Sequence, residues 1–126
     1  MKLRIKGNTL RLRLLRSEVD RLACAGVVSD EIRFGVDTDQ ALKYSIAATD
    51  GVEVVTAQFS DSQILILLPE TTALEWTTTE RVGIEAEQDV GEDTVLSILI
   101  EKDFECIARP DDPDREDTFP NPTTAC

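Results

Sequence analysis

The chain has 126 residues, a formal net charge of −12 and 41% apolar residues, which suits one folded unit with a core. It contains no histidine, which excludes Ser-His-Asp and Cys-His catalysis and removes the commonest transition-metal ligand. The three cysteines lie far apart, so zinc-ribbon and CxxC redox motifs are excluded as well. We therefore expect no cofactor and no metal, and we favour a protein that is not an enzyme.

The chain begins with a predicted β-hairpin. Leu3 and Ile5 alternate with Lys and Arg, which indicates a strand with one buried face. The pair Gly7 and Asn8 is typical of a tight turn, and a second alternating segment covers residues 10–14.

A helix and two more strands are predicted to follow. Ser17 and Asp20 are spaced like a capping box, which predicts a helix that starts near Ser17 and ends at Gly26. Apolar residues at 32 and 34 suggest a short strand, and apolar residues at every second position from 42 to 48 suggest another.

The second half of the chain repeats this order. Its segments are strands at 55–59 and 64–68, a helix at 69–76, and strands at 82–86 and 94–103. A shift of 54 residues places Leu12 on Ile66 and Leu22 on Trp76. Because each half is too small to bury its own sheet face, we predict an α+β, mostly β, fold. It is a pseudo-twofold repeat of strand-strand-helix-strand-strand that shares one core, either sandwich or barrel-like.

The composition changes after the last predicted strand. Four of the five prolines lie in the last 17 residues, among the segments "DDPDRED" and "FPNPTTAC". Proline interrupts both helices and strands, so we assign residues 105–126 to an acidic, proline-rich C-terminal arm. Residues 1–104 are assigned to a single β-rich domain, with repeat halves at about 1–50 and 51–104.

A basic hairpin is the first candidate site. Residues 1–21 hold seven basic and two acidic residues, a balance of +5, which leaves −17 for the remainder. The candidate partner-binding residues share one face of the predicted hairpin: Lys2, Arg4, Lys6, Arg11 and Arg13. Three interpretations stay open. These cations pair internally with Glu85, Glu87 or the arm, they bind a protein partner, or they bind nucleic acid.

Four apolar side chains are predicted to face outward once the core is filled. They are Leu65, Leu67, Val95 and Leu99. The arm could cover this apolar outer patch with Phe104, Ile107 and Phe119, or a second copy of the chain could cover it in a homodimer. The third alternative is that the strand faces are misassigned.

Two groups of carboxylates are candidate sites. Asp112, Asp114 and Glu116 alternate like calcium ligands, but no glycine or spaced glutamate accompanies them, so we favour a solvated acidic turn. Glu101 and Asp103 also alternate on one strand face and could serve acid–base chemistry, although nothing in the sequence marks a cleft.

The segment "KGNTLRLRLLRSEVDRL" is similar to the start of the swapped-hairpin antitoxin and transition-state-regulator fold. The matching residues are Gly7, Asn8, Thr9, Leu10, Leu12, Leu14, Val19 and Leu22. That resemblance implies the order strand-strand-helix-strand-strand in each half. It also implies DNA-binding dimers, which a fused pair of halves would imitate in one chain.

A second resemblance covers nearly the whole chain. The segments "MKLRIKGNTLRLRL", "EKDFECI" and "FPNP" look like a family of small acidic bacterial proteins of unknown function. This resemblance implies a bacterial, cytoplasmic origin and no particular activity.

The sequence favours an interaction or regulatory protein that is not catalytic. Its expected partner is another protein or a second copy of the chain, and the alternative is a nucleic-acid-binding regulator of the swapped-hairpin type. No apolar segment reaches the roughly 18 residues of a membrane span, and the N-terminus lacks the apolar block of a signal peptide. We therefore expect a cytoplasmic protein that does not contact membranes.

Overall fold

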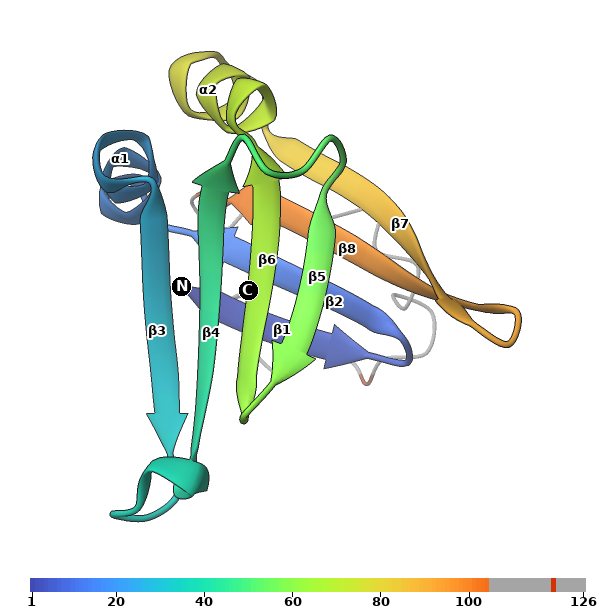
Figure 1. The fold of residues 1–126 in the computed structure, drawn as a ribbon. Coiled ribbons are helices and arrows are strands. Elements are labelled where there is room, and N and C mark those ends of the chain that lie inside the picture. The colour runs from blue at the N-terminus through green and yellow to red at the C-terminus, as the bar shows by residue number, and fades with distance from the viewer. Residues whose placement is uncertain (105–118, 120–126) are drawn as a thin grey trace.

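A computed structural model describes residues 1–104 and residue 119. The order strand, strand, helix, strand, strand occurs twice, and one short 3-10 helix lies in the first half (Figure 1). The elements are β1 (Lys2–Lys6), β2 (Thr9–Leu14), α1 (Arg16–Ala25), β3 (Val27–Arg33), η1 (Thr38–Gln40), β4 (Ala41–Thr49), β5 (Thr56–Ser60), β6 (Gln63–Pro69), α2 (Glu70–Thr78), β7 (Gly83–Gly91) and β8 (Thr94–Lys102).

The strands form two four-stranded sheets, and each sheet combines one hairpin from each half of the chain. Sheet A has the strand order β1-β2-β8-β7, and sheet B has the order β3-β4-β6-β5. A parallel pair joins the two halves in each sheet, β2 with β8 and β4 with β6. The predicted fold class and its repeat are confirmed. The two sheets do not close into a barrel (Figure 1).

The two sheets have the same strand register. Thr9 pairs with Ser97 in sheet A, and Gln63 pairs with Lys43 in sheet B. Both partners are shifted by 54 positions (9 to 63, and 43 to 97), which is the shift predicted from the sequence. Positions related in this way are called equivalent below.

The shift is 56 positions for β3 and β7. Val27 pairs with Ala47, whereas Gly83 pairs with Glu101. Four residues separate α2 from β7, whereas one separates α1 from β3, and α2 is one residue shorter than α1, so the shift grows by two. The β7-β8 turn is correspondingly shorter than the β3-β4 loop, which holds η1, and the shift returns to 54 in β8.

Local signals explain the ends of α1. Glu18, and not the predicted pair of Ser17 and Asp20, caps the helix, because its Oε1 atom accepts the backbone N–H of Leu15 at 2.9 Å. Gly26 has a φ of 77° and ends the helix in the left-handed conformation, as predicted.

The predicted turn at Asp61 and Ser62 is present, but the third strand lies at other residues than predicted. Asp61 and Ser62 have φ values of 51° and 59°, which is the type I′ geometry of a two-residue hairpin turn. The third strand starts earlier than predicted and ends at Arg33, so the prediction that Phe34 belongs to this strand is wrong. Phe34 is exposed in the loop that follows.

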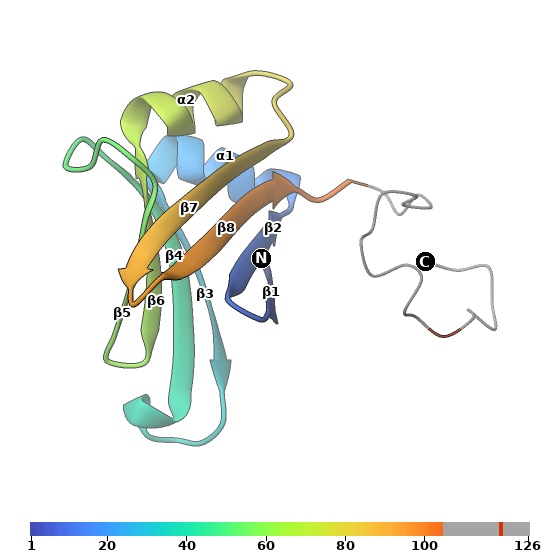
Figure 2. The ribbon, with the colours of Figure 1, turned by 90° about the vertical axis from the view of Figure 1, so that its right-hand side faces the viewer.

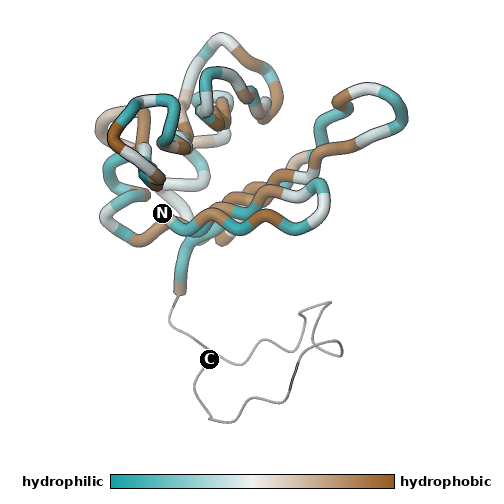
Figure 3. Tube along the Cα trace, turned by 90° about the horizontal axis from the view of Figure 1, so that it is seen from below, coloured by the Kyte–Doolittle hydropathy of each residue, from teal (hydrophilic) through white to brown (hydrophobic). Residues whose placement is uncertain are grey.

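The core lies between the two sheets, and α1 and α2 lie side by side over one end of it (Figure 2). Apolar and polar residues alternate along several strands (Figure 3), and the inward-facing side chains of both sheets form the apolar core. Trp76 is completely buried, and its Nε1 atom donates to the carbonyl oxygen of Val82 at 3.0 Å. The buried side chains come from both halves: Leu12, Leu14, Val19, Leu22, Val28, Ile46, Ile64, Ile66, Leu68, Ala73, Trp76, Ile84, Ile98 and Ile100.

The equivalent core residues Leu12 and Ile66 are both fully buried and should contribute similarly to stability. We expect Leu12→Ala and Ile66→Ala each to lower the free energy of unfolding by about 2–5 kcal/mol, through lost burial and the cavity left behind. Urea denaturation followed by Trp76 fluorescence measures the change. Leu74→Ala, at an exposed position, is the control and should change it by about 0.5 kcal/mol or less. A loss at one core position only would contradict a shared core.

Candidate interaction surface

The outer face of sheet A carries the predicted cations. Lys2, Arg4 and Lys6 on β1 pair with Arg13, Arg11 and Thr9 on β2, so five cations occupy one face of this hairpin. We call Lys2, Arg4, Lys6, Arg11 and Arg13 the basic hairpin face. The same outer face continues across β8 and β7 with Leu99, Glu101, Glu85, Glu87 and Asp89.

Glu101 lies between two of these cations. Arg11 Nε donates to Glu101 Oε1 at 2.7 Å, and Arg13 Nε donates to the same oxygen at 2.6 Å. The guanidinium groups are about a quarter exposed, and the carboxylate side chain is 15% exposed. Internal pairing of the basic residues was one predicted alternative, but the carboxylate that pairs Arg11 and Arg13 is Glu101 rather than Glu85 or Glu87.

The two arginines determine the charge state of Glu101. Burial by itself would raise the pKa of Glu101, but the hydrogen bonds and charges of Arg11 and Arg13 outweigh burial and lower the pKa below its ordinary value. The carboxylate is therefore ionised at neutral pH, and it fixes the two arginine side chains on the outer face of the sheet.

The second carboxylate of the predicted acid–base pair also contacts the basic hairpin. Asp103 Oδ2 lies 3.1 Å from Lys2 Nζ, directly after the end of β8. Glu101 and Asp103 are thus both engaged by cations from β1 and β2.

The start of β1 is held by contacts to α1 and sheet B. The α-ammonium of Met1 donates to Glu18 on α1 and, at 3.2 Å, to Asp30 on β3, while the hydroxyl of Tyr44 donates to the carbonyl oxygen of Met1. Burial would lower the pKa of this ammonium, but the two carboxylates outweigh burial and raise it. Burial, together with the same carboxylates, raises the pKa of Tyr44.

The structure places the four outward apolar side chains on two different sheets. Leu65 and Leu67 lie on the outer face of sheet B, whereas Val95 and Leu99 lie on the outer face of sheet A. Leu65, Leu67 and Leu99 are half-buried, and Val95 is exposed.

Two of the arm residues proposed to cover these side chains are exposed. Phe104 is 56% exposed and Phe119 is 95% exposed. Ile107 lies outside the described residues, as do Asp112, Asp114 and Glu116 of the expected acidic turn.

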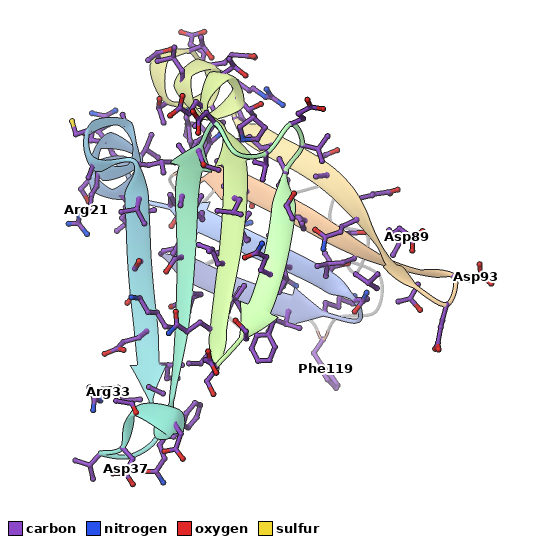
Figure 4. All side chains as sticks on the ribbon, in the orientation of Figure 1. Arg21, Arg33, Asp37, Asp89, Asp93 and Phe119 are labelled. Atoms are coloured by element: carbon purple, nitrogen blue, oxygen red, sulfur yellow. The ribbon has the colours of Figure 1, made fainter. Side chains whose placement is uncertain are left out.

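Equivalent positions on the two outer faces differ sharply in charge. The equivalent pairs, with the residue of sheet A first, are Lys2 and Thr56, Arg4 and Gln58, Lys6 and Ser60, Arg11 and Leu65, Arg13 and Leu67, Glu101 and Ala47, Leu99 and Ser45, and Glu85 and Ser29. Charges on the outer face of sheet B gather toward one end, at Glu31, Arg33 and Lys43. Figure 4 shows Arg33 at this end and Asp89 at the equivalent position of β7. The same backbone thus carries a charged face on one sheet and a mainly neutral face on the other.

The outer face of sheet A is also hollowed beside Leu99. One hollow of about 470 Å³ is lined by Thr9, Ser97 and Glu87, and a second of about 410 Å³ is lined by Gly83 and Glu101. Both are shallow, and they exist because small side chains stand next to long charged ones.

Two other kinds of site are absent from the described residues. Among residues 1–104 and 119, no group of three or more Cys, Asp or Glu residues could hold a metal ion. In the same part of the chain, neither helix is long and apolar enough to cross a membrane.

Fold and surface together define a two-sheet α+β protein in which two repeat halves exchange hairpins. The chain belongs to the family of unknown function DUF7009, whose sequence pattern matches residues 1–123. The expected membership of a family without an assigned function is thereby confirmed. No curated protein and no solved structure matches the chain. Similarity to the swapped-hairpin regulators is not shown by these comparisons and stays a prediction.

Glu101→Gln should destabilise the protein, because two arginines would then face each other without a carboxylate. We expect the free energy of unfolding at pH 7 to fall by about 2 kcal/mol. Since the pKa of native Glu101 is lowered, the difference from wild type should persist above the ordinary Glu pKa of about 4.3 and disappear as the pH falls through the native value. Urea denaturation from acid to neutral pH measures this. Exposed Glu87→Gln is the control, and equal effects of the two variants would refute the role of Glu101.

Proposed function

We propose that this protein is a non-catalytic interaction or regulatory protein that binds a protein partner through the basic hairpin face. The observation that carries the proposal is the contrast between equivalent hairpins. The β5-β6 hairpin has the same register as β1-β2, but its outward positions hold Thr56, Gln58, Ser60, Leu65 and Leu67. The fold therefore forms without cations at these positions, and the cations of β1 and β2 serve another purpose.

The distribution of charge supports a partner with short acidic segments. Glu85, Glu87 and Asp89 lie on the same outer face, beside the basic hairpin face and beyond β8. A long polyanion such as duplex DNA would bring phosphates against these carboxylates, whereas a short acidic segment can stay above β1 and β2. The alternative, nucleic-acid binding of the swapped-hairpin type, is therefore treated as an outcome of the test.

The proposal also covers the domain organisation and the cellular compartment of the protein. Residues 1–104 form the binding domain and residues 105–126 form an acidic arm. The protein works in the cytoplasm of a bacterium and needs no cofactor.

A triple variant transfers the neutral residues of sheet B to sheet A. Arg11→Leu, Arg13→Leu and Glu101→Ala reproduce the equivalent residues Leu65, Leu67 and Ala47. Because the ion pairs are removed together, we expect stability within about 1 kcal/mol of wild type and loss of the partner. Native mass spectrometry of gently purified protein should show an added protein mass on the wild type and none on the variant.

Two results would overturn this proposal. One is a partner mass that the folded triple variant retains. The other is binding of a labelled DNA duplex that weakens steeply between about 50 and 200 mM salt and is lost when Arg11 and Arg13 are exchanged for Glu, which would favour the nucleic-acid alternative.

A further inference from the structure

The two halves present equivalent edge strands, β1 in sheet A and β5 in sheet B. Residues of an antiparallel pair alternate between hydrogen-bonded and non-hydrogen-bonded positions. Lys6 and Thr9, which flank the two-residue turn, form a hydrogen-bonded pair. Leu3 and Ile5 therefore occupy non-hydrogen-bonded positions, and their backbone N–H and C=O groups point away from β2. By the same alternation, the backbone groups of Ala57 point away from β6.

The β5 edge is closed at Ala57 by a side chain. Gln88 on β7 accepts the backbone N–H of Ala57 at 2.7 Å through Oε1, and its Nε2 donates to the carbonyl oxygen of Ala57 at 3.0 Å. The amide of Gln88 thus takes the place of a neighbouring strand, which keeps another chain from pairing at this point.

Within the part of the chain that the structure describes, the equivalent edge of β1 has no such contact. The residue equivalent to Gln88 is Ile32, and the residue equivalent to Ala57 is Leu3. Ile32 has no amide with which to bind the backbone. Among residues 1–104 and 119, the outward backbone groups of Leu3 and Ile5 have no hydrogen-bond partner.

The side chains along the β1 edge indicate what would bind there. Ile5 is 60% exposed and Ile32 is 48% exposed, so apolar surface lies on the inner side of the edge. On the outer side, β1 carries Lys2, Arg4 and Lys6. An added strand that alternates acidic and apolar residues would meet both surfaces at once, because successive side chains of a strand point to opposite faces.

We propose that the β1 edge binds an extended acidic segment of a partner protein as a fifth strand of sheet A. The acidic side chains of this segment contact the cations of β1, its apolar side chains cover Ile5 and Ile32, and its backbone pairs with Leu3 and Ile5. The proposal rests on the proposed function, since it names the chemistry of the partner that the basic hairpin face binds.

Two other occupants fit the edge less well. A second copy that paired β1 with β1 would place like charges opposite one another, which is destabilising. The arm of this chain carries four prolines within residues 110–122, and proline lacks the N–H that a new strand must donate. A partner segment without proline avoids both difficulties.

The test uses the full chain and a labelled synthetic peptide of eight residues that alternates glutamate and valine. Fluorescence anisotropy should show binding to the wild type. A peptide with lysine in place of glutamate tests the charge, and the glutamate peptide N-methylated at every residue tests the backbone bonds. We expect both to bind at least about tenfold more weakly. Hydrogen exchange at the amides of Leu3 and Ile5 should slow by at least about tenfold in the complex.

Two variants locate the bound peptide. Ile32→Gln installs the equivalent of Gln88 and should weaken binding by at least about tenfold while stability, measured in urea, stays near wild type. Arg4→Glu should weaken binding as strongly, and Lys43→Glu, an exposed cation on sheet B, is the matched control that should leave binding unchanged.

The outcomes separate this inference from the proposed function. If Arg4→Glu abolishes binding but N-methylation and Ile32→Gln do not, the peptide lies across the basic hairpin face, and strand addition is overturned while the proposed function stands. If Arg4→Glu and Lys43→Glu have equal effects, or the peptide does not bind the wild type, the inference fails. Binding that appears only after truncation at residue 104 would assign the edge to the arm and also overturn it.

Discussion

The parallel pairing of β2 with β8 and of β4 with β6 is the constraint on which the rest of the structure depends. Each hairpin finds its neighbouring strands in the other half of the chain, and an isolated two-stranded hairpin is at best marginally stable in water. The core needs the same arrangement, because Leu12 packs within a cluster that also contains Ile66 and Trp76. Neither half can fold around its own apolar residues, so the two halves form one cooperative unit.

The exchange of hairpins gives the molecule two outer faces with the same backbone and different side chains. Sheet B shows what the fold requires at these positions, which is little more than small or moderately apolar residues. The cations and Glu101 of sheet A have no charged counterparts at these positions of sheet B, and Arg11 and Arg13 lower the pKa of Glu101 through their hydrogen bonds and charges. The same comparison distinguishes the edges: the amide of Gln88 bonds the backbone of Ala57, whereas Leu3, at the equivalent position, has no such contact among the described residues.

Local patterns in the sequence predicted the hairpins, both helices and the repeat, because alternation and turn chemistry act over a few residues. They could not predict which sheet a strand joins, and this is why Leu65 and Leu99 were grouped although they lie on different sheets. The role of Glu101 was missed because it depends on β8 lying beside β2. The sequence does show that Gln88 is a polar residue on the same strand face as inward-facing Ile84 and Ala86. Its hydrogen bond to the backbone of Ala57 is visible only in the structure.

The covalent connection between the halves has a consequence for how such a surface can arise. In a dimer of identical chains, every substitution appears twice, so a basic hairpin would occur on both sheets and both edges would be open or closed together. One continuous chain removes that restriction, and each half can change independently while the shared backbone is preserved. The compensating change in two loop lengths around β7 shows how far the halves have diverged without disturbing the strand register. Joining the two copies in one chain thus allows a pseudosymmetric fold to carry a basic face on only one of its two sheets.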